Sequence, residues 1–193
     1  MKKKVLFIDR DGTLIIETDD YKIEKFEKLI FYPEIFYWLG KIAREFDYEL
    51  AMVTNQDGLG TEAFPEKEFY ELNDFILRTF EGEKIHFEGI HIDKSYPHEN
   101  LPTRKPATGM LTKYFSDDYD LKKSFVIGDR ITDVLLAKNL GCKCFWLNDG
   151  RNLGAGETGS DNAETLKDFI AVESRDWQKI YEYLKAPKPP KGA

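Results

Sequence analysis

The sequence predicts an α/β fold in which helices cover both faces of a parallel β-sheet. Short apolar segments alternate along the chain with longer amphipathic segments, as when each strand is followed by a crossover helix. Several apolar segments are nearly continuous in hydrophobic residues, which is typical of strands buried on both faces. The length of 193 residues suits one domain, expected over residues 1–186, and the Pro- and Lys-rich residues 187–193 are expected to form a tail or linker.

The individual elements follow from apolar spacing and from turn residues. The expected strands are 4–9, 49–55, 87–92, 124–129 and 143–147, with a weaker sixth at 169–172. The expected helices have apolar residues at helical spacing, and several begin at a proline or a capping residue. They are 33–46, 65–82, 106–115, 132–141 and 174–184. The glycine-rich segment 150–164 is expected to be a surface loop.

Composition narrows the range of partners and locations. The net charge of −7 argues against nucleic acid or an anionic membrane as the main partner. The two cysteines, Cys142 and Cys144, are too close in sequence to suggest a disulfide framework, which fits a reducing cytoplasm. The N-terminus does not resemble a signal peptide, and no stretch approaches the ~18 apolar residues of a membrane helix. We therefore expect a cytoplasmic protein.

Two aspartates one residue apart follow the first expected strand, in the segment FIDRDGTLIIE (7–17). Carboxylates this close repel each other, so their placement at the end of a buried strand calls for a function. Other polar side chains follow the second and fourth strands, and parallel sheets bind ligands beyond the carboxyl ends of their strands. The side chains expected at this edge are Asp9, Asp11, Thr54, Asn55, Lys105, Asp129 and Asp133.

The carboxylates of this edge predict a magnesium site. Mg²⁺ takes hard oxygen ligands, and two or three aspartates form a natural site for it. We expect Asp9 and Asp129 to bind the ion directly and Asp11 to contribute its backbone carbonyl. Asp133 lies one helical turn after Asp129, where it would hold a metal-bound water or orient Lys105.

Magnesium and a lysine at one edge suit phosphoryl transfer, in which a protein mainly positions groups and neutralises charge. Asp9 is the candidate nucleophile, which would form an aspartyl-phosphate. Asp11 is the candidate acid and base, which protonates the leaving oxygen and later takes a proton from water. Lys105 would neutralise phosphate oxygens, and the Thr54 hydroxyl and the amides near Asn55 would bind them.

The motifs DRDGT, VTN, RKP and GDRITD resemble, in this order, the four motifs of the haloacid-dehalogenase-like phosphatases. The resemblance covers residues 4 to about 147, and the combination of motifs is far more specific than any one of them. It implies a Rossmann-like fold and magnesium. It also implies that Asp9 is the nucleophile and Asp11 the acid and base, as the residues themselves suggest.

A finer resemblance concerns the substrate. The segments NQDGLGTEAFP (55–65), IIE and KLIFYP (28–33) are similar to the histidinol-phosphate phosphatases of histidine biosynthesis. This similarity implies hydrolysis of L-histidinol phosphate, a small phosphate ester, to L-histidinol and phosphate. It also implies possible fusion to, or association with, an imidazoleglycerol-phosphate dehydratase domain. Glu17 is the candidate partner of the cationic part of the substrate, and Arg104 of the RKP motif is a further candidate contact.

Two features distinguish this chain within the resemblance. The related enzymes usually carry a zinc site of three cysteines and a histidine before the third motif. Here the corresponding positions hold Asp93, Ser95, Leu101 and Thr103, so no structural zinc is expected. The motif spacings also leave no room for a large cap domain, so the loops 55–65 and 93–104 would confer specificity.

Other interpretations of these residues stay open. A sugar-phosphate phosphatase, such as one acting on a heptose bisphosphate, is the enzymatic alternative. A receiver-like phosphoacceptor domain also combines an acidic pair, a threonine and a lysine, although its phosphoacceptor follows the third strand. Helix capping alone could explain Asp129 and Asp133. A solvated hairpin position could explain Glu17.

Overall fold

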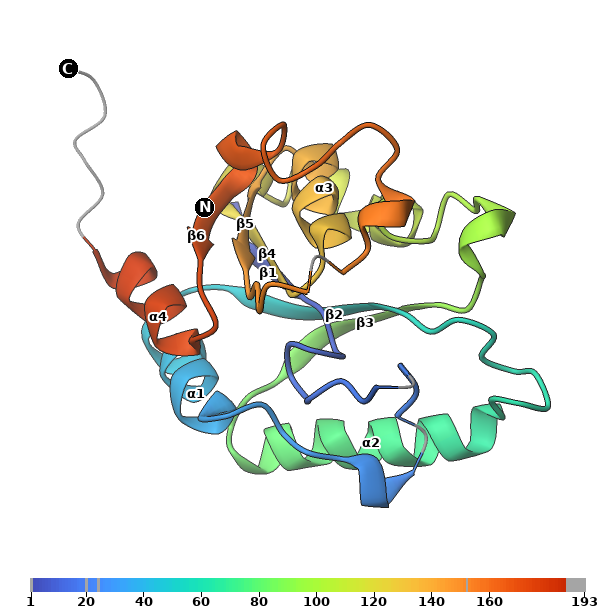
Figure 1. Cartoon of the computed structure of the whole chain (residues 1–193). Helices are drawn as coiled ribbons and strands as arrows, with labels where there is room; N and C mark the ends of the chain where they lie inside the picture. The colour runs from blue at the N-terminus through green and yellow to red at the C-terminus, as the bar shows by residue number, and fades with distance from the viewer. Residues whose placement is uncertain (1, 20, 24, 152, 187–193) are drawn as a thin grey trace.

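The computed structural model describes residues 2–19, 21–23, 25–151 and 153–186, so the expected tail at 187–193 lies outside the described residues. Within these ranges six strands form one parallel sheet in the order β3-β2-β1-β4-β5-β6 (Figure 1). The predicted parallel sheet is confirmed, including its weak sixth strand. The strands are β1 (Val5–Ile8), β2 (Glu49–Asn55), β3 (Phe87–Asp93), β4 (Phe125–Gly128), β5 (Lys143–Trp146) and β6 (Ile170–Glu173).

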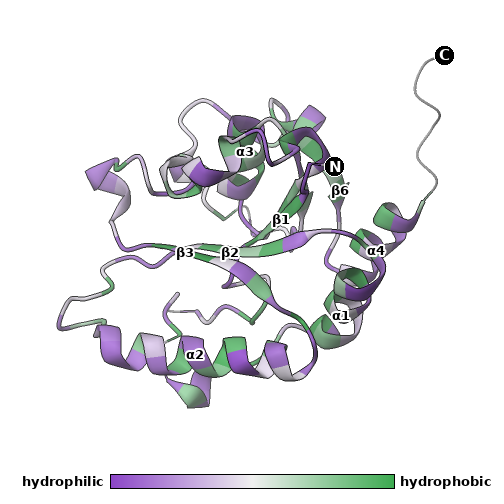
Figure 2. Ribbon diagram, turned by 180° about the vertical axis from the view of Figure 1, so that it is seen from behind, coloured by the Kyte–Doolittle hydropathy of each residue, from purple (hydrophilic) through white to green (hydrophobic). Residues whose placement is uncertain are grey.

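Helices cover both faces of the sheet, as predicted. One face packs against α1 (Ile35–Glu45), α2 (Glu66–Gly82) and α4 (Trp177–Lys185), and the other against α3 (Ile131–Leu140). Figure 1 shows α3 on the side of the sheet opposite to α2. In Figure 2 hydrophilic and hydrophobic residues alternate along α2, as expected of an amphipathic helix at the surface.

The central strand β1 feeds both halves of the core. Leu6 and Ile8 pack with α1, α2 and α4, whereas Val5 and Phe7 pack with α3, because successive side chains of a strand point to opposite faces. All four side chains are fully buried, which explains the unbroken apolar sequence of this strand. Burial on both faces fixes the register of β1 and therefore the position of the residues that follow it.

The helix predicted over 106–115 is wrong as an α-helix. The structure has a 3-10 helix over Gly109–Phe115, with non-helical backbone angles at Leu111. The backbone N–H groups at its start bond back to the preceding loop, from Ala107 to the Arg104 carbonyl and from Gly109 to the Pro102 carbonyl, each at 2.8 Å. Within the segment, Leu111 donates its N–H to the Thr108 carbonyl, three residues back, at 2.8 Å, which is the spacing of a 3-10 helix rather than of an α-helix.

The order of the strands brings three strand ends together. β1 lies between β2 and β4, with Ile8 in register with both Met52 and Ile127. The residues after β1, at the end of β2 and after β4 therefore share one edge of the sheet. Residues 9–34 and 56–65 lead from these strands to α1 and α2 without a large cap domain in the described part of the chain, as expected. Likewise, none of the described helices has the length and apolarity of a membrane span.

Candidate active site

Three carboxylates converge at the shared strand edge. Asp9, Asp129 and Asp133 each offer an oxygen within 4.8 Å of the others, and in the described part of the chain they form the one such cluster of metal-binding side chains. Both carboxylate oxygens of Asp129 are buried without a hydrogen-bond partner among the described residues. Burial first, and next the charges of Asp9 and Asp133, raise the pKa of Asp129 well above its usual range. Unpaired buried oxygens among like charges fit a divalent cation.

Two structural features fix Asp129. Trp146, at the end of β5, donates its indole N–H to the Asp129 carbonyl at 3.0 Å. Gly12 has a positive φ of 73°, and a Cβ at that position would lie 2.1 Å from Asp129 Oδ2. Only glycine therefore lets the turn after β1 approach this carboxylate.

Lys105 lies beneath the carboxylates rather than at the surface. Its ammonium is 2.8 Å from Asp9 Oδ1 and 2.8 Å from Asp133 Oδ1, and its side chain is 3% exposed. Burial alone lowers the pKa of Lys105, but Asp133 and Asp9 outweigh this effect and raise it overall. Burial also raises the pKa of Asp133 to about 6, against the opposing effect of Lys105. Asp133 in addition accepts the backbone N–H of Arg130 at 3.1 Å, so it both caps α3 and orients the lysine.

Asn55, at the end of β2, holds the backbone of Lys105. The side-chain amide of Asn55 donates to the Lys105 carbonyl at 2.9 Å, and its oxygen accepts the Lys105 N–H at 3.0 Å. The Asn55 side chain is therefore occupied with the lysine backbone. Thr54 is buried, and its hydroxyl oxygen accepts a hydrogen bond from the Gln56 amide at 2.8 Å.

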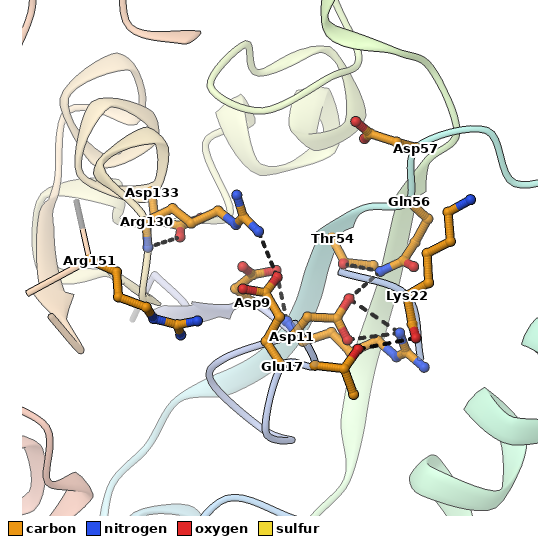
Figure 3. A network of polar contacts seen from close by, with 12 residues as sticks. Asp9, Asp11, Glu17, Lys22, Thr54, Gln56, Asp57, Arg130, Asp133 and Arg151 are labelled. Carbon is orange, nitrogen blue, oxygen red and sulfur yellow. Dashed lines mark hydrogen bonds and ion pairs between the residues drawn. The ribbon is translucent and has the colours of Figure 1, made fainter. Parts of the chain in front are cut away.

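Asp11 points away from the carboxylate cluster. It is held by Arg10, whose Nη1 is 2.9 Å from Asp11 Oδ1, and by Gln56, whose Nε2 is 2.6 Å from Asp11 Oδ2. Asp11 lines the same cavity as Asp9, so the two aspartates flank one space with different surroundings. In Figure 3 Gln56 lies between Thr54 and Asp11.

The two remaining sequence candidates line the cavity but are already paired. Glu17 Oε1 accepts a hydrogen bond from Arg130 Nη2 at 2.6 Å, while Glu17 Oε2 is buried without a partner among the described residues. Burial raises the pKa of Glu17, with Arg130 opposing. Arg104 Nη1 is 2.5 Å from Asp57 Oδ1, and its Nη2 is 2.8 Å from Glu157 Oε2. The structure thus makes Arg104 a bridge between two loops.

The site is a cavity of about 470 Å³ above the strand ends. Part of the cavity wall was not predicted from the sequence. The loop at 153–157, expected to be an ordinary surface loop, lines the cavity through Glu157 and its glycines, and Tyr21 and Arg130 lie on another side. Arg130 lies inside the GDRITD motif, but no local pattern marks the others, because contacts between distant loops place them there.

Hydrogen bonds hold the loop before Lys105. Asp93, at the end of β3, accepts the backbone N–H of Ser95 at 2.8 Å and also its hydroxyl. Its second oxygen accepts the Thr103 hydroxyl at 2.5 Å. Asp93, Ser95 and Thr103, three of the four positions that hold zinc ligands in the related enzymes, are therefore joined by hydrogen bonds. The fourth, Leu101, is 45% exposed.

The fold and this site define the class of protein. A family model described as HAD-hydrolase-like matches residues 102–171. The chain belongs to the haloacid-dehalogenase-like hydrolases.

The chain is similar in sequence to curated proteins that share one name. The chain is 52% identical over 186 residues to the histidine biosynthesis bifunctional protein HisB of Bacteroides fragilis. It is 47% identical over 188 residues to the protein of the same name from Spirosoma linguale. These matches cover 95% and 96% of this chain but 48% and 49% of the two relatives. The chain therefore spans about half the length of the curated relatives it matches.

Solved structures support the fold. A D,D-heptose 1,7-bisphosphate phosphatase from B. bronchiseptica, complexed with magnesium and phosphate, superposes with a TM-score of 0.73 at 21% identity, covering 94% of this chain and 97% of that one. A HAD-like phosphatase from Mesorhizobium loti gives a TM-score of 0.72, also at 21% identity, covering 95% and 85%. At this identity the likeness establishes the fold alone.

Proposed function

We propose that this chain is a magnesium-dependent phosphomonoesterase that hydrolyses L-histidinol phosphate to L-histidinol and phosphate through an aspartyl-phosphate. The observation that carries the chemistry is the pair of aspartates in one cavity with opposite surroundings. Asp9 lies in the carboxylate cluster beside Lys105, at 2.8 Å, whereas Asp11 is turned away toward Arg10 and Gln56. This difference supports Asp9 as the nucleophile and Asp11 as the group that transfers protons.

Asp9 serves as the nucleophile in this proposal. Among the described residues its contacts use Oδ1, which accepts the backbone N–H of Arg10 at 2.8 Å and lies 2.8 Å from the Lys105 ammonium. Oδ2 is then the oxygen that attacks phosphorus, while the bond from phosphorus to the leaving oxygen breaks. Lys105 steadies Asp9 and balances the charge of the transferred group. The Thr54 oxygen accepts from Gln56, so its own proton can be donated to a phosphate oxygen.

Asp11 carries the proton in both halves of the reaction. In the first half it gives a proton to the leaving oxygen, which departs as the alcohol. In the second half a water attacks phosphorus, and Asp11 takes the proton of that water as the bond to Asp9 breaks. Phosphate leaves, and both aspartates return to their initial state.

The carboxylate cluster fits Mg²⁺. Asp9 and Asp129 are the proposed direct ligands with the Asp11 carbonyl, and Asp133 supports them from α3. The unpaired, buried oxygens of Asp129 are the feature that favours a cation here. When bound, the ion would supply positive charge against the phosphate oxygens.

The charge of the cavity wall favours an amino alcohol phosphate over a bisphosphate. Arg104 is shared by two carboxylates, Asp57 and Glu157, so this side of the cavity keeps negative charge. That side attracts the ammonium of histidinol and repels the second phosphate of a heptose bisphosphate. Glu17 adds a further carboxylate to the cavity wall, although it pairs with Arg130 and its side chain is 3% exposed. The names of the bifunctional relatives agree with a role in histidine biosynthesis.

Phosphate release from matched substrates tests this proposal. The purified chain, with Mg²⁺ and with a chelator as control, is given L-histidinol phosphate and D-glycero-D-manno-heptose 1,7-bisphosphate in parallel. We expect kcat/KM to favour L-histidinol phosphate by about tenfold or more, a difference of about 1.4 kcal/mol in the barrier. Glu157→Gln, which removes one wall charge, should reduce that preference. A preference for the bisphosphate would overturn the substrate assignment, and a stable phosphoprotein without turnover would indicate a receiver-like function.

The proposal extends to organisation and location. We propose one phosphatase domain over residues 1–186, working in the cytoplasm, with a dehydratase domain as the fused or associated partner. This arrangement is supported by the bifunctional relatives, because the chain matches only about half of their length. The buried, unpaired thiols of Cys142 and Cys144 agree with a reducing compartment.

A further inference from the structure

Arg10, the residue between the two aspartates, has an unusual environment. Its side chain is completely buried, among the largest fully buried side chains of the described residues. Its guanidinium lies over the Phe69 ring, 4.8 Å from the ring centre, and its Nε has no hydrogen-bond partner among the described residues. A buried cation is costly, and an apolar residue of similar volume is often at least as stabilising. Stability alone does not account for an arginine here.

The contacts of Arg10 are directed at Asp11. Nη1 is 2.9 Å from Asp11 Oδ1 and 3.3 Å from Oδ2, so one nitrogen spans both carboxylate oxygens. The other terminal nitrogen makes a long hydrogen bond of 3.5 Å to the Ile23 carbonyl. The Phe69 ring, from α2, packs against the face of the guanidinium as a cation–π contact and limits its movement.

Gln56 contacts the same carboxylate from the end of β2. Its amide nitrogen donates to Asp11 Oδ2 at 2.6 Å and to Thr54 Oγ1 at 2.8 Å, and its side chain is buried (Figure 3). Both Asp11 oxygens are therefore held by donors from two different strand ends. A carboxylate held in this way keeps one orientation toward the cavity.

We propose that Arg10 and Gln56 are positioning residues that orient the Asp11 carboxylate for proton transfer to the leaving oxygen. This inference rests on the proposed phosphatase function. It assigns to neither residue a contact with substrate. Without the two donors Asp11 would rotate about its side-chain bonds, and its oxygen would spend less time within reach of the leaving group.

The leaving group provides the discriminating readout. L-histidinol phosphate releases an alkoxide, which needs a proton from Asp11 as the phosphorus–oxygen bond breaks. p-Nitrophenyl phosphate releases a stabilised phenolate, which needs none. The quantity to compare is kcat/KM, because it reports the steps up to departure of the leaving group and excludes the later hydrolysis common to both substrates.

The experiment uses near-isosteric variants. Gln56→Met and Arg10→Met remove the donors while filling similar space, and Arg10→Lys keeps the charge but cannot reproduce the spacing of the guanidinium nitrogens. We expect the ratio of kcat/KM for L-histidinol phosphate to kcat/KM for p-nitrophenyl phosphate to fall about threefold or more in both Met variants. Arg10→Lys should recover part of the loss.

A control separates positioning from general damage. Asn73 is a buried amide of α2 that does not line the cavity, and its Oδ1 has no partner among the described residues. Asn73→Leu should change the two kcat/KM values by the same factor. Gln56→Met also frees Thr54, which binds phosphate in both substrates, so the ratio of the two values isolates the effect on Asp11.

The outcomes are distinct. An equal loss with both substrates in the Gln56 and Arg10 variants would overturn the positioning role and leave a structural one. If Arg10→Met does not fold, judged by circular dichroism, Gln56→Met and Arg10→Lys still decide. A wild type that hydrolyses p-nitrophenyl phosphate but not L-histidinol phosphate refutes the proposed substrate, and the comparison then uses whichever alkyl phosphate it does hydrolyse. A wild type that releases no phosphate from any ester refutes the phosphatase function itself.

Discussion

Replacing Asp129 by asparagine should uncouple the stability of the protein from magnesium. In the structure the Asp129 carboxylate is buried, unpaired and close to Asp9 and Asp133, with Lys105 as the one buried ammonium that contacts the cluster within the described residues. Three carboxylates against one ammonium leave an excess of negative charge, which a divalent cation would neutralise. Asp129→Asn keeps the shape of the side chain and removes one of these charges.

The magnitudes follow from linkage and from the cost of unpaired polar groups. At a free Mg²⁺ concentration of about 100 times the dissociation constant, binding raises the unfolding free energy by about 2.7 kcal/mol. For a chain of this size that corresponds to a rise in Tm of about 5–11 °C. Without metal, Asp129→Asn should be more stable than the wild type by about 1.5–3 kcal/mol, because it removes one of three like charges and its NH2 group can donate a hydrogen bond to a neighbouring carboxylate.

Thermal unfolding followed by circular dichroism, with chelator and with a series of Mg²⁺ concentrations, measures both effects. Asp161→Asn is the matched control, because Asp161 pairs with Lys138 outside the cavity. The control should keep the full response to magnesium, and Asp129→Asn should lose most of it. An unchanged magnesium response in Asp129→Asn, or a metal-free variant less stable than the wild type, would refute the assignment of Asp129 as a ligand.

Other variants address the remaining parts of the site. Asp9→Asn should reduce phosphate release by more than about a thousandfold while the circular dichroism spectrum is unchanged. Asp11→Asn should prolong the phosphorylated intermediate even with good leaving groups, as measured by rapid quench, and an unchanged lifetime would exclude it as the acid and base. Asn55→Ala frees the backbone of Lys105 and should lower kcat about tenfold or more. Elemental analysis should find no stoichiometric zinc in the protein, and one zinc per chain lost together with activity would show that residues of the loop 93–104 do bind metal.

The sequence predicted most of the fold because its signals are local. The continuous apolar strands and amphipathic helices appear in the order expected, and the weak strand near Phe169 is present as β6. The helix at 106–115 failed for a physical reason. Its apolar spacing is helical, but Leu111 donates its N–H to the Thr108 carbonyl, three residues back, and has non-helical backbone angles. A sequence pattern does not show which acceptor a backbone donor will find.

The candidate site was predictable where motifs place residues at strand ends. Asp9 and Asp129 meet in the structure because parallel strands share one edge, and the connection after β3 brings Lys105 to them. Partners from distant loops were not predictable. Nothing near Glu17 in the sequence indicates its pairing with Arg130, 113 residues away.

The roles of Trp146 and Arg104 were likewise not predictable from the sequence. Trp146 is an apolar aromatic residue of the kind expected in the core, yet its indole N–H donates a hydrogen bond to the Asp129 carbonyl. Arg104 was expected to contact substrate; it lines the cavity, and it also joins Asp57 to Glu157 across two loops, which no sequence motif indicated. In each case the role depends on a tertiary contact that only the folded chain reveals.

Detection of phosphate on Asp9 is the most direct test of the proposed mechanism. The protein is mixed with Mg²⁺ and L-histidinol phosphate, quenched in acid within milliseconds, and digested for peptide mass spectrometry. We expect one phosphoryl group on the peptide that contains Asp9, absent in Asp9→Asn and longer-lived in Asp11→Asn. Phosphate release without phosphorylated Asp9, together with continued turnover by Asp9→Asn, would contradict this mechanism.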